Sequence, residues 1–136
     1  MATEDRTGER DLTETEIEAL HEVELGVEWL HRAHGKLVAF HHNTSHAMEH
    51  LATAEDLLRE SGHDDIADAV RDAYLPRGVI DDDRWSYDVV ESFEAGFMHD
   101  VRELADRARR DVADGRSHVA ERRQEREWKR RAEDGR

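Results

Sequence analysis

Apolar residues recur every three or four positions between residues 13 and 60, at the spacing of a heptad repeat. Two heptad positions carry this pattern, and we call them the seam. The first seam position is occupied by Leu20, Val27, His34, His41, Met48 and Glu55, and the second by Val23, Leu30, Leu37, Thr44, Leu51 and Leu58. The phase holds for more than five heptads and predicts one long helix.

Signals at both ends of this run support a helix over residues 13–60. Thr13 and Glu16 have the spacing of a capping box, in which each side chain accepts a hydrogen bond from the other residue's backbone N–H. Gly62 is placed to end the helix. Gly35 lies inside the run, and two helices that break there are the alternative. We favour one helix, because an interior glycine costs only about 1 kcal/mol and a turn gives no reason for the heptad phase to continue.

A short helix is predicted next, with Asp64 placed to cap it and Pro76 and Gly78 placed to stop it. Residues 76–83 form the clearest loop.

A second long helix is predicted after that loop, with Asp82 or Asp83 as its cap, Ala113 near its end and Gly115 closing it. Its apolar residues step by three or four: Val90, Phe93, Phe97, Val101, Leu104 and Ala108. No segment shows the alternation of a β-strand. The predicted fold class is therefore all-α.

Charge divides the chain into parts. The formal charge is −14 overall, with a net −17 in residues 1–115 and a net +3 in residues 116–136. Residues 1–12 are polar without periodicity and predict a disordered N-terminal tail. Residues 13–115 are the predicted helical domain. Residues 116–136 form a basic helix or arm, because this segment favours a helix but has too few apolar residues for a buried face.

The amino-acid composition bears on whether the acidic chain is disordered or adapted to high salt. Only 26 of 136 residues are Leu, Ile, Val or Phe, a content that with this charge is typical of disorder, but helical periodicity argues against disorder here. The chain has 34 acidic residues, and its basic residues are 18 arginines but only two lysines. This composition resembles that of proteins from salt-in halophilic archaea, without indicating a family. An ordinary acidic protein is the alternative.

The compartment is predicted from what the sequence lacks. There is no cysteine, which excludes disulfides and thiolate metal sites. The first residues lack the apolar run of a secretory signal, and no stretch has the length of a membrane span. We therefore expect a cytoplasmic protein with no membrane contact.

The seam predicts a partner, because one helix cannot bury it alone and the two long helices differ in length. We expect two long antiparallel helices plus a short connecting helix, with the helical bundle completed by dimerisation. A homodimer meets this need with one kind of chain.

Two seam histidines are the first candidates for chemistry. Seven of the ten histidines lie on the long helix, and His34 and His41 occupy seam positions otherwise held by apolar residues. From the other long helix, Glu91, Glu94 and His99 are placed to face them, which would assemble ligands for a divalent metal such as Zn, Fe or Mn. We favour the interpretation that both histidines form hydrogen bonds in the seam and set its register.

Weaker candidates lie elsewhere. His42, His46 and His50 are spaced i, i+4, i+8 on one helix face and are a second candidate metal set, although this face points away from the seam and a solvated stripe is the alternative. Glu-x-x-His spacings ending at His21 and His31 match di-iron proteins, but such short patterns arise by chance in this composition. Residues 81–83 are three aspartates and suit capping or solvation better than a cation loop.

No phosphate-binding loop, nucleophile motif or other catalytic signature is found, so no enzymatic activity is evident. The leading hypothesis is a salt-adapted helical protein that acts by self-association and protein interaction. One alternative is the metal-binding helical bundle. Another is a nucleic-acid accessory protein that uses the basic arm, whose cluster comprises Arg122, Arg123, Arg126, Trp128, Lys129, Arg130 and Arg131. Molar salt would weaken such binding strongly.

Overall fold

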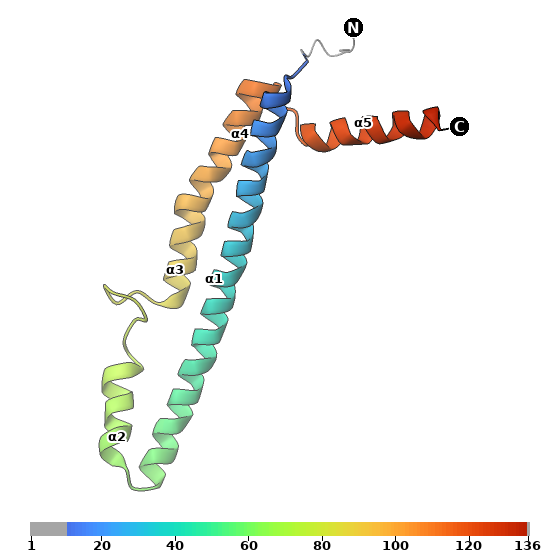
Figure 1. The fold of residues 1–136 in the computed structure, drawn as a ribbon. Helices are drawn as coiled ribbons and strands as arrows, with labels where there is room; N and C mark the ends of the chain where they lie inside the picture. The colour runs from blue at the N-terminus through green and yellow to red at the C-terminus, as the bar shows by residue number, and fades with distance from the viewer. Residues whose placement is uncertain (1–10, 136) are drawn as a thin grey trace. The chain divides into compact units, whose positions relative to one another are not determined.

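The computed structural model describes residues 11–135 (Figure 1). Within them the structure is mostly helical, with no β-strand, and the all-α fold class is confirmed. The helices are α1 Glu14–Glu60, α2 Asp64–Ala69, the π-helical turn η1 Val70–Tyr74, α3 Ser86–Phe93, the π-helical turn η2 Glu94–Met98, α4 His99–Ala113 and α5 Val119–Asp134. Most of the predicted disordered tail, residues 1–10, lies outside the described residues.

Helix α1 is a single helix of 47 residues that continues through Gly35. The predicted capping box is present at its start. The Thr13 backbone N–H donates to Glu16 Oε1 at 2.9 Å, and the Glu16 backbone N–H donates to Thr13 Oγ1 at 3.1 Å. The prediction of one long helix is confirmed, since local capping and the unbroken heptad phase outweigh the small cost of Gly35.

The end of α1 is a Schellman motif centred on Gly62, whose φ of +86° favours glycine. The Gly62 N–H donates to the Arg59 carbonyl at 3.2 Å, and the His63 N–H donates to the Leu58 carbonyl at 2.8 Å. These bonds satisfy carbonyls that the helix itself leaves without partners. The predicted stop is therefore confirmed.

Both predicted caps of the later helices are wrong. His63 is the N-cap of α2, and Asp64 is the first residue of the helix. Helix α3 begins at Ser86 instead of at residue 83 or 84, and its Trp85 N–H donates to the Asp88 carboxylate at 2.9 Å. Asp82 and Asp83 both lie in the preceding loop with positive φ.

The loop before α3 explains why Asp83 is not a cap. The Asp83 carboxylate accepts a hydrogen bond from the Gly78 N–H at 2.6 Å. Ile80 and Arg84 exchange two backbone hydrogen bonds, both of 3.2 Å, across the turn between them. A Cβ atom at Gly78 would lie 2.3 Å from the Asp83 carbonyl carbon, so the close approach requires glycine.

The chain divides into two compact units, and α1 contributes to both. Of the described residues, the terminal unit comprises 11–30 and 98–135, and the middle unit comprises 31–97.

The terminal unit contains a small apolar core where α1, α4 and α5 meet. Buried Ile17 and Leu20 of α1 pack with Ala113 of α4 and Val119 of α5. Partly buried side chains around them are Leu12, Ala108, Val112 and Ala120. This core fixes the first turn of α5 against α1.

Polar links connect helices of the middle unit. The Arg59 guanidinium donates to Glu55 within α1 at 2.8 Å and to Asp68 of α2 at 2.9 Å. Hydrogen bonds to both carboxylates raise the pKa of Arg59. Among the apolar side chains of this unit, only Ala67 is buried.

Candidate functional site

His34 contacts one of its predicted partners. Its Nε2 atom lies 2.5 Å from Glu94 Oε2 at the start of η2, with the two side chains 25% and 48% exposed. Glu91 is exposed on α3. His34 and Glu94 therefore form a hydrogen-bonded pair within the middle unit.

His41 has a different kind of partner. Its Nδ1 atom lies 2.7 Å from the hydroxyl oxygen of Ser86, which is buried at the start of α3. The Tyr87 ring stands edge-on to the imidazole, with 6.3 Å between the ring centroids. Each seam histidine thus has its own hydrogen-bond partner from α3 or η2, an arrangement that suits the register-setting interpretation.

The other predicted ligands are exposed. His42, His46 and His50 all lie at the surface of α1, and His46 Nδ1 is 3.6 Å from Glu49. His99 belongs to the terminal unit, where its two ring nitrogens lie 3.4 Å from Asp100 and 3.8 Å from Glu103.

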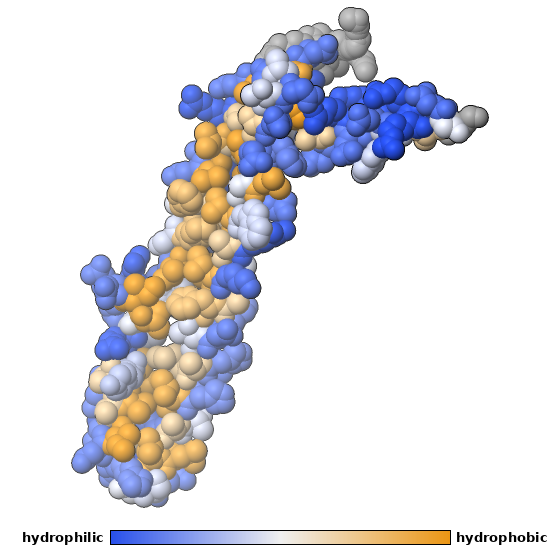
Figure 2. All heavy atoms as spheres, viewed as in Figure 1, coloured by the Kyte–Doolittle hydropathy of each residue, from blue (hydrophilic) through white to orange (hydrophobic). Residues whose placement is uncertain are grey.

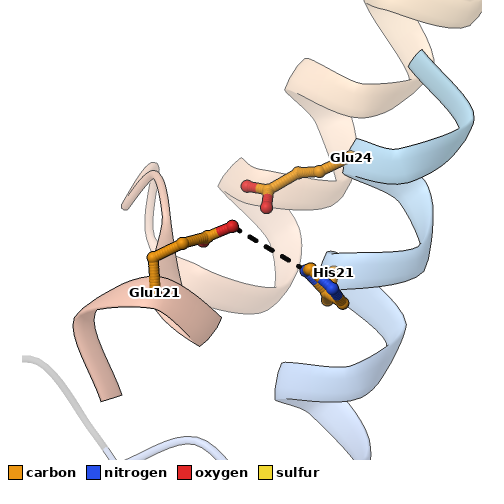
Figure 3. A group of neighbouring side chains, drawn as sticks. All are labelled: His21, Glu24 and Glu121. Atoms are coloured by element: carbon orange, nitrogen blue, oxygen red, sulfur yellow. Dashed lines mark ion pairs between the residues drawn. The ribbon is translucent and has the colours of Figure 1, made fainter. Parts of the chain in front are cut away.

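A group that the sequence did not single out lies in the terminal unit. His21 and Glu24 of α1 and Glu121 of α5 place one nitrogen and two carboxylate oxygens within 4.8 Å of one another. Figure 3 shows the three side chains pointing toward one another from the two helices. Within residues 11–135, the other group of three with this spacing is His99, Asp100 and Glu103, all exposed on α4.

Apolar packing brings Glu121 to α1. Leu20 and Val119 are buried in the same core, and each is close in sequence to a member of the group. Arg123 forms an ion pair with Glu14, which adds a second link between α5 and the first turn of α1. Glu121 also lies in the first turn of α5, where the helix dipole favours a carboxylate.

The Nδ1 atom of His21 is buried and has no hydrogen-bond partner. The closest carboxylate oxygen that pairs with it belongs to Glu121 and is 3.9 Å away, beyond hydrogen-bond distance. The imidazole as a whole is 40% exposed, so its other edge meets solvent while Nδ1 faces inward. A buried polar atom without a partner is uncommon and costly.

Only part of this three-residue group could be recognised from the sequence. His21 and Glu24 are three residues apart, a spacing that places them on one helix face. Glu121 lies in another helix about 100 residues away, and no local pattern connects it to His21. The Glu18–His21 spacing considered above did not reveal the group.

Arginines line a groove in the same unit. The groove has a volume of about 600 Å³ and is lined in part by Arg116, Arg122, Arg123 and Arg126, together with Asp11 and Glu14. Arg123 pairs with Glu14 and Arg122 pairs with Glu125. Hydrogen bonds from Lys129 and Arg122 lower the pKa of Glu125 below its usual value.

Large apolar side chains reach the surface of the middle unit. Nine of them are exposed, by 36% to 63%: Phe40, Leu51, Leu57, Ile66, Tyr74, Val79, Ile80, Tyr87 and Phe97. Figure 2 shows apolar residues at the surface on the face drawn. The functional proposals below are based on two features, this apolar surface and the group around His21.

Comparisons of the chain with protein-family models, with curated proteins and with solved structures found no match. Within residues 11–135, every helix is too short or too polar to cross a membrane.

Proposed function

We propose that the protein acts by self-association in a salt-rich cytoplasm, as a homodimer in which each copy covers the apolar side chains of the other. The observation that carries this proposal is the middle unit, which exposes nine large apolar side chains and buries one small one, Ala67. The function is then a structural or protein-interaction role, without enzymatic activity.

The hydrophobic effect supplies the reason for association. Full burial of a large apolar side chain contributes about 1.5–3 kcal/mol relative to leaving it exposed. Monomeric proteins rarely expose large contiguous apolar patches. A second copy is a self-complementary occupant, since a twofold axis lets the same surface serve on both sides. An antiparallel pair of long helices from each copy would complete a four-helix bundle.

Charge determines the conditions under which two copies can meet. Each chain carries −14, so the copies repel one another in dilute salt. At 1 M salt the screening length falls to about 3 Å, which removes most of this repulsion. Residues 116–136 carry a net +3 and would be attracted to the acidic residues 1–115 of the other copy.

Sedimentation velocity of the untagged chain in about 1 M KCl tests the proposal. We expect a species of twice the chain mass of 15.8 kDa. The double variant Phe40→Glu/Leu51→Glu places charge on the exposed apolar surface and should sediment as a monomer. The control is Ala39→Glu/Thr53→Glu, which adds the same charge to exposed positions of α1 away from the seam and should remain dimeric.

A wild-type monomer under these conditions would contradict the homodimer. Equal dimerisation of both double variants would show that the apolar surface of the middle unit is not the interface. Circular dichroism of each variant distinguishes lost association from lost helix.

A further inference from the structure

We propose that His21, Glu24 and Glu121 form a binding site for a divalent transition-metal ion, which joins the first turn of α5 to α1. The proposal does not depend on self-association, because all three residues belong to the terminal unit of one chain. It also differs from the metal sets that the seam and the stripe on α1 predicted.

The spacing of the donor atoms suits one ion. Zinc binds imidazole nitrogen at about 2.0–2.1 Å and carboxylate oxygen at about 2.0–2.2 Å, so tetrahedral ligands lie about 3.4 Å apart. The His21 Nδ1 and Glu121 oxygen atoms are 3.9 Å apart, and all three donor atoms lie within 4.8 Å of one another. Binding of one ion would require the donors to move closer together, and the Glu24 and Glu121 side chains can rotate to do so.

The buried state of His21 Nδ1 points to a ligand. This atom pairs with the Glu121 carboxylate at 3.9 Å, is shielded from water and lacks a hydrogen-bond partner (Figure 3). A metal ion would use its lone pair, and two carboxylates balance the charge of a divalent cation. One imidazole with two carboxylates is a donor set that zinc, iron or manganese accepts, with water in the remaining coordination position.

The second three-residue group lacks these features. His99, Asp100 and Glu103 are all exposed and all belong to α4. The two ring nitrogens of His99 each pair with a different carboxylate, Nδ1 with Asp100 and Nε2 with Glu103. The His99 ring therefore lies between two surface carboxylates. This second group serves as the internal control for metal binding.

The site would connect residues that are about 100 positions apart. Val119 and Ala120 already pack against α1 through the core, which holds Glu121 near His21 before an ion binds. Bound metal would therefore reinforce an existing contact of α5.

Equilibrium dialysis of the untagged full-length chain against Zn²⁺, in a non-chelating buffer, measures the site directly. We expect one tight Zn²⁺ ion per chain. Replacing a direct ligand should weaken binding at least as much as the 10–100-fold loss typical of residues behind the ligands, so His21→Ala should lose about 100-fold or more. Glu121→Gln keeps the side-chain shape and should lose at least about tenfold.

His46→Ala is the matched control, because it removes an exposed imidazole from the same helix, and His99→Ala tests the second group. Both should bind Zn²⁺ as the wild type does. A long-range ¹H–¹⁵N spectrum of the histidine rings should show the His21 Nδ1 resonance moving on zinc addition.

Three results would overturn the proposal. One is a wild-type chain without a tight Zn²⁺ site. Another is a His21→Ala chain that keeps native circular dichroism and binds Zn²⁺ with unchanged affinity. A third is a loss of affinity in His46→Ala or His99→Ala instead, which would assign the ion to the surface histidines.

Discussion

His34 and Glu94 are sixty residues apart in the sequence, and their side chains meet with Nε2 2.5 Å from Oε2. The pair links α1 to η2 within the middle unit. The two side chains are 25% and 48% exposed, so water weakens their interaction and the contact contributes little to stability.

A double-mutant cycle measures the energy of that contact. His34→Ala, Glu94→Ala and the double variant should give a favourable coupling of about 0.2–1 kcal/mol in chemical denaturation, the range for exposed pairs. A coupling of zero would show that the contact contributes nothing to stability.

Ser86→Ala should destabilise the chain more than loss of the exposed pair. The Ser86 hydroxyl is buried and lies 2.7 Å from His41 Nδ1, so its removal leaves the imidazole nitrogen without this partner. The expected cost is about 1–3 kcal/mol in the free energy of unfolding. Ser92→Ala is the control, because Ser92 is exposed on the same helix and should change stability by less than about 0.5 kcal/mol. Equal effects of both substitutions would contradict the importance of the His41 contact.

Gly35→Ala should stabilise the chain by about 1 kcal/mol, because alanine favours a helix interior more than glycine. A Cβ atom at Gly35 meets nothing within 4 Å. Gly115→Ala is the matched comparison, since a Cβ atom there also meets nothing within 4 Å but φ is +86°. It should destabilise by about 1–2 kcal/mol, the cost of a left-handed alanine. Thermal unfolding should show a higher midpoint temperature for Gly35→Ala and a lower one for Gly115→Ala. A destabilised Gly35→Ala chain would contradict the prediction that a side chain at position 35 is tolerated within the helix.

Lys129→Met should raise the pKa of Glu125. The Lys129 ammonium lies 2.8 Å from Glu125, and its hydrogen bond is the largest cause of the lowered pKa. Arg122→Met should raise the same pKa by less. A carbon-detected NMR titration measures both shifts.

The lowered pKa of Glu125 also determines how its contribution to the stability of the fold changes with pH. The folded value lies below the ordinary glutamate value of about 4.3, so the stabilisation is fully present above that pH. It is lost as pH falls through the folded value. An unchanged Glu125 titration in Lys129→Met would contradict this assignment.

Dialysis from about 1 M to about 0.1 M KCl should reduce the helical signal in circular dichroism, because the screening length grows to about 10 Å and the net charge of −14 repels itself. Refolding on return to high salt is the control for irreversible loss. A helical signal that is the same in both solutions would contradict the salt-adapted interpretation of the composition.

Much of the fold follows from local sequence. The capping box at Thr13 and the glycine stop at Gly62 depend on residues within one or two turns, and the heptad phase continues through Gly35. For this reason the sequence predicts a helix over residues 13–60, and α1 is observed over Glu14–Glu60. The class of the fold follows from the same periodicity. Glu94, which contacts His34, is one of three residues that the sequence places to face the seam histidines.

Tertiary structure decided what joins distant segments. The sequence places Asp82 or Asp83 to cap a helix, but the Asp83 carboxylate binds the Gly78 N–H, a partner that exists only once the loop has folded. Glu121 meets His21 because left-handed residues Asp114 and His118 redirect the chain and Val119 packs in the core. Sequence spacing determines which residues share a helix face, whereas a contact between helices depends on turn geometry and packing.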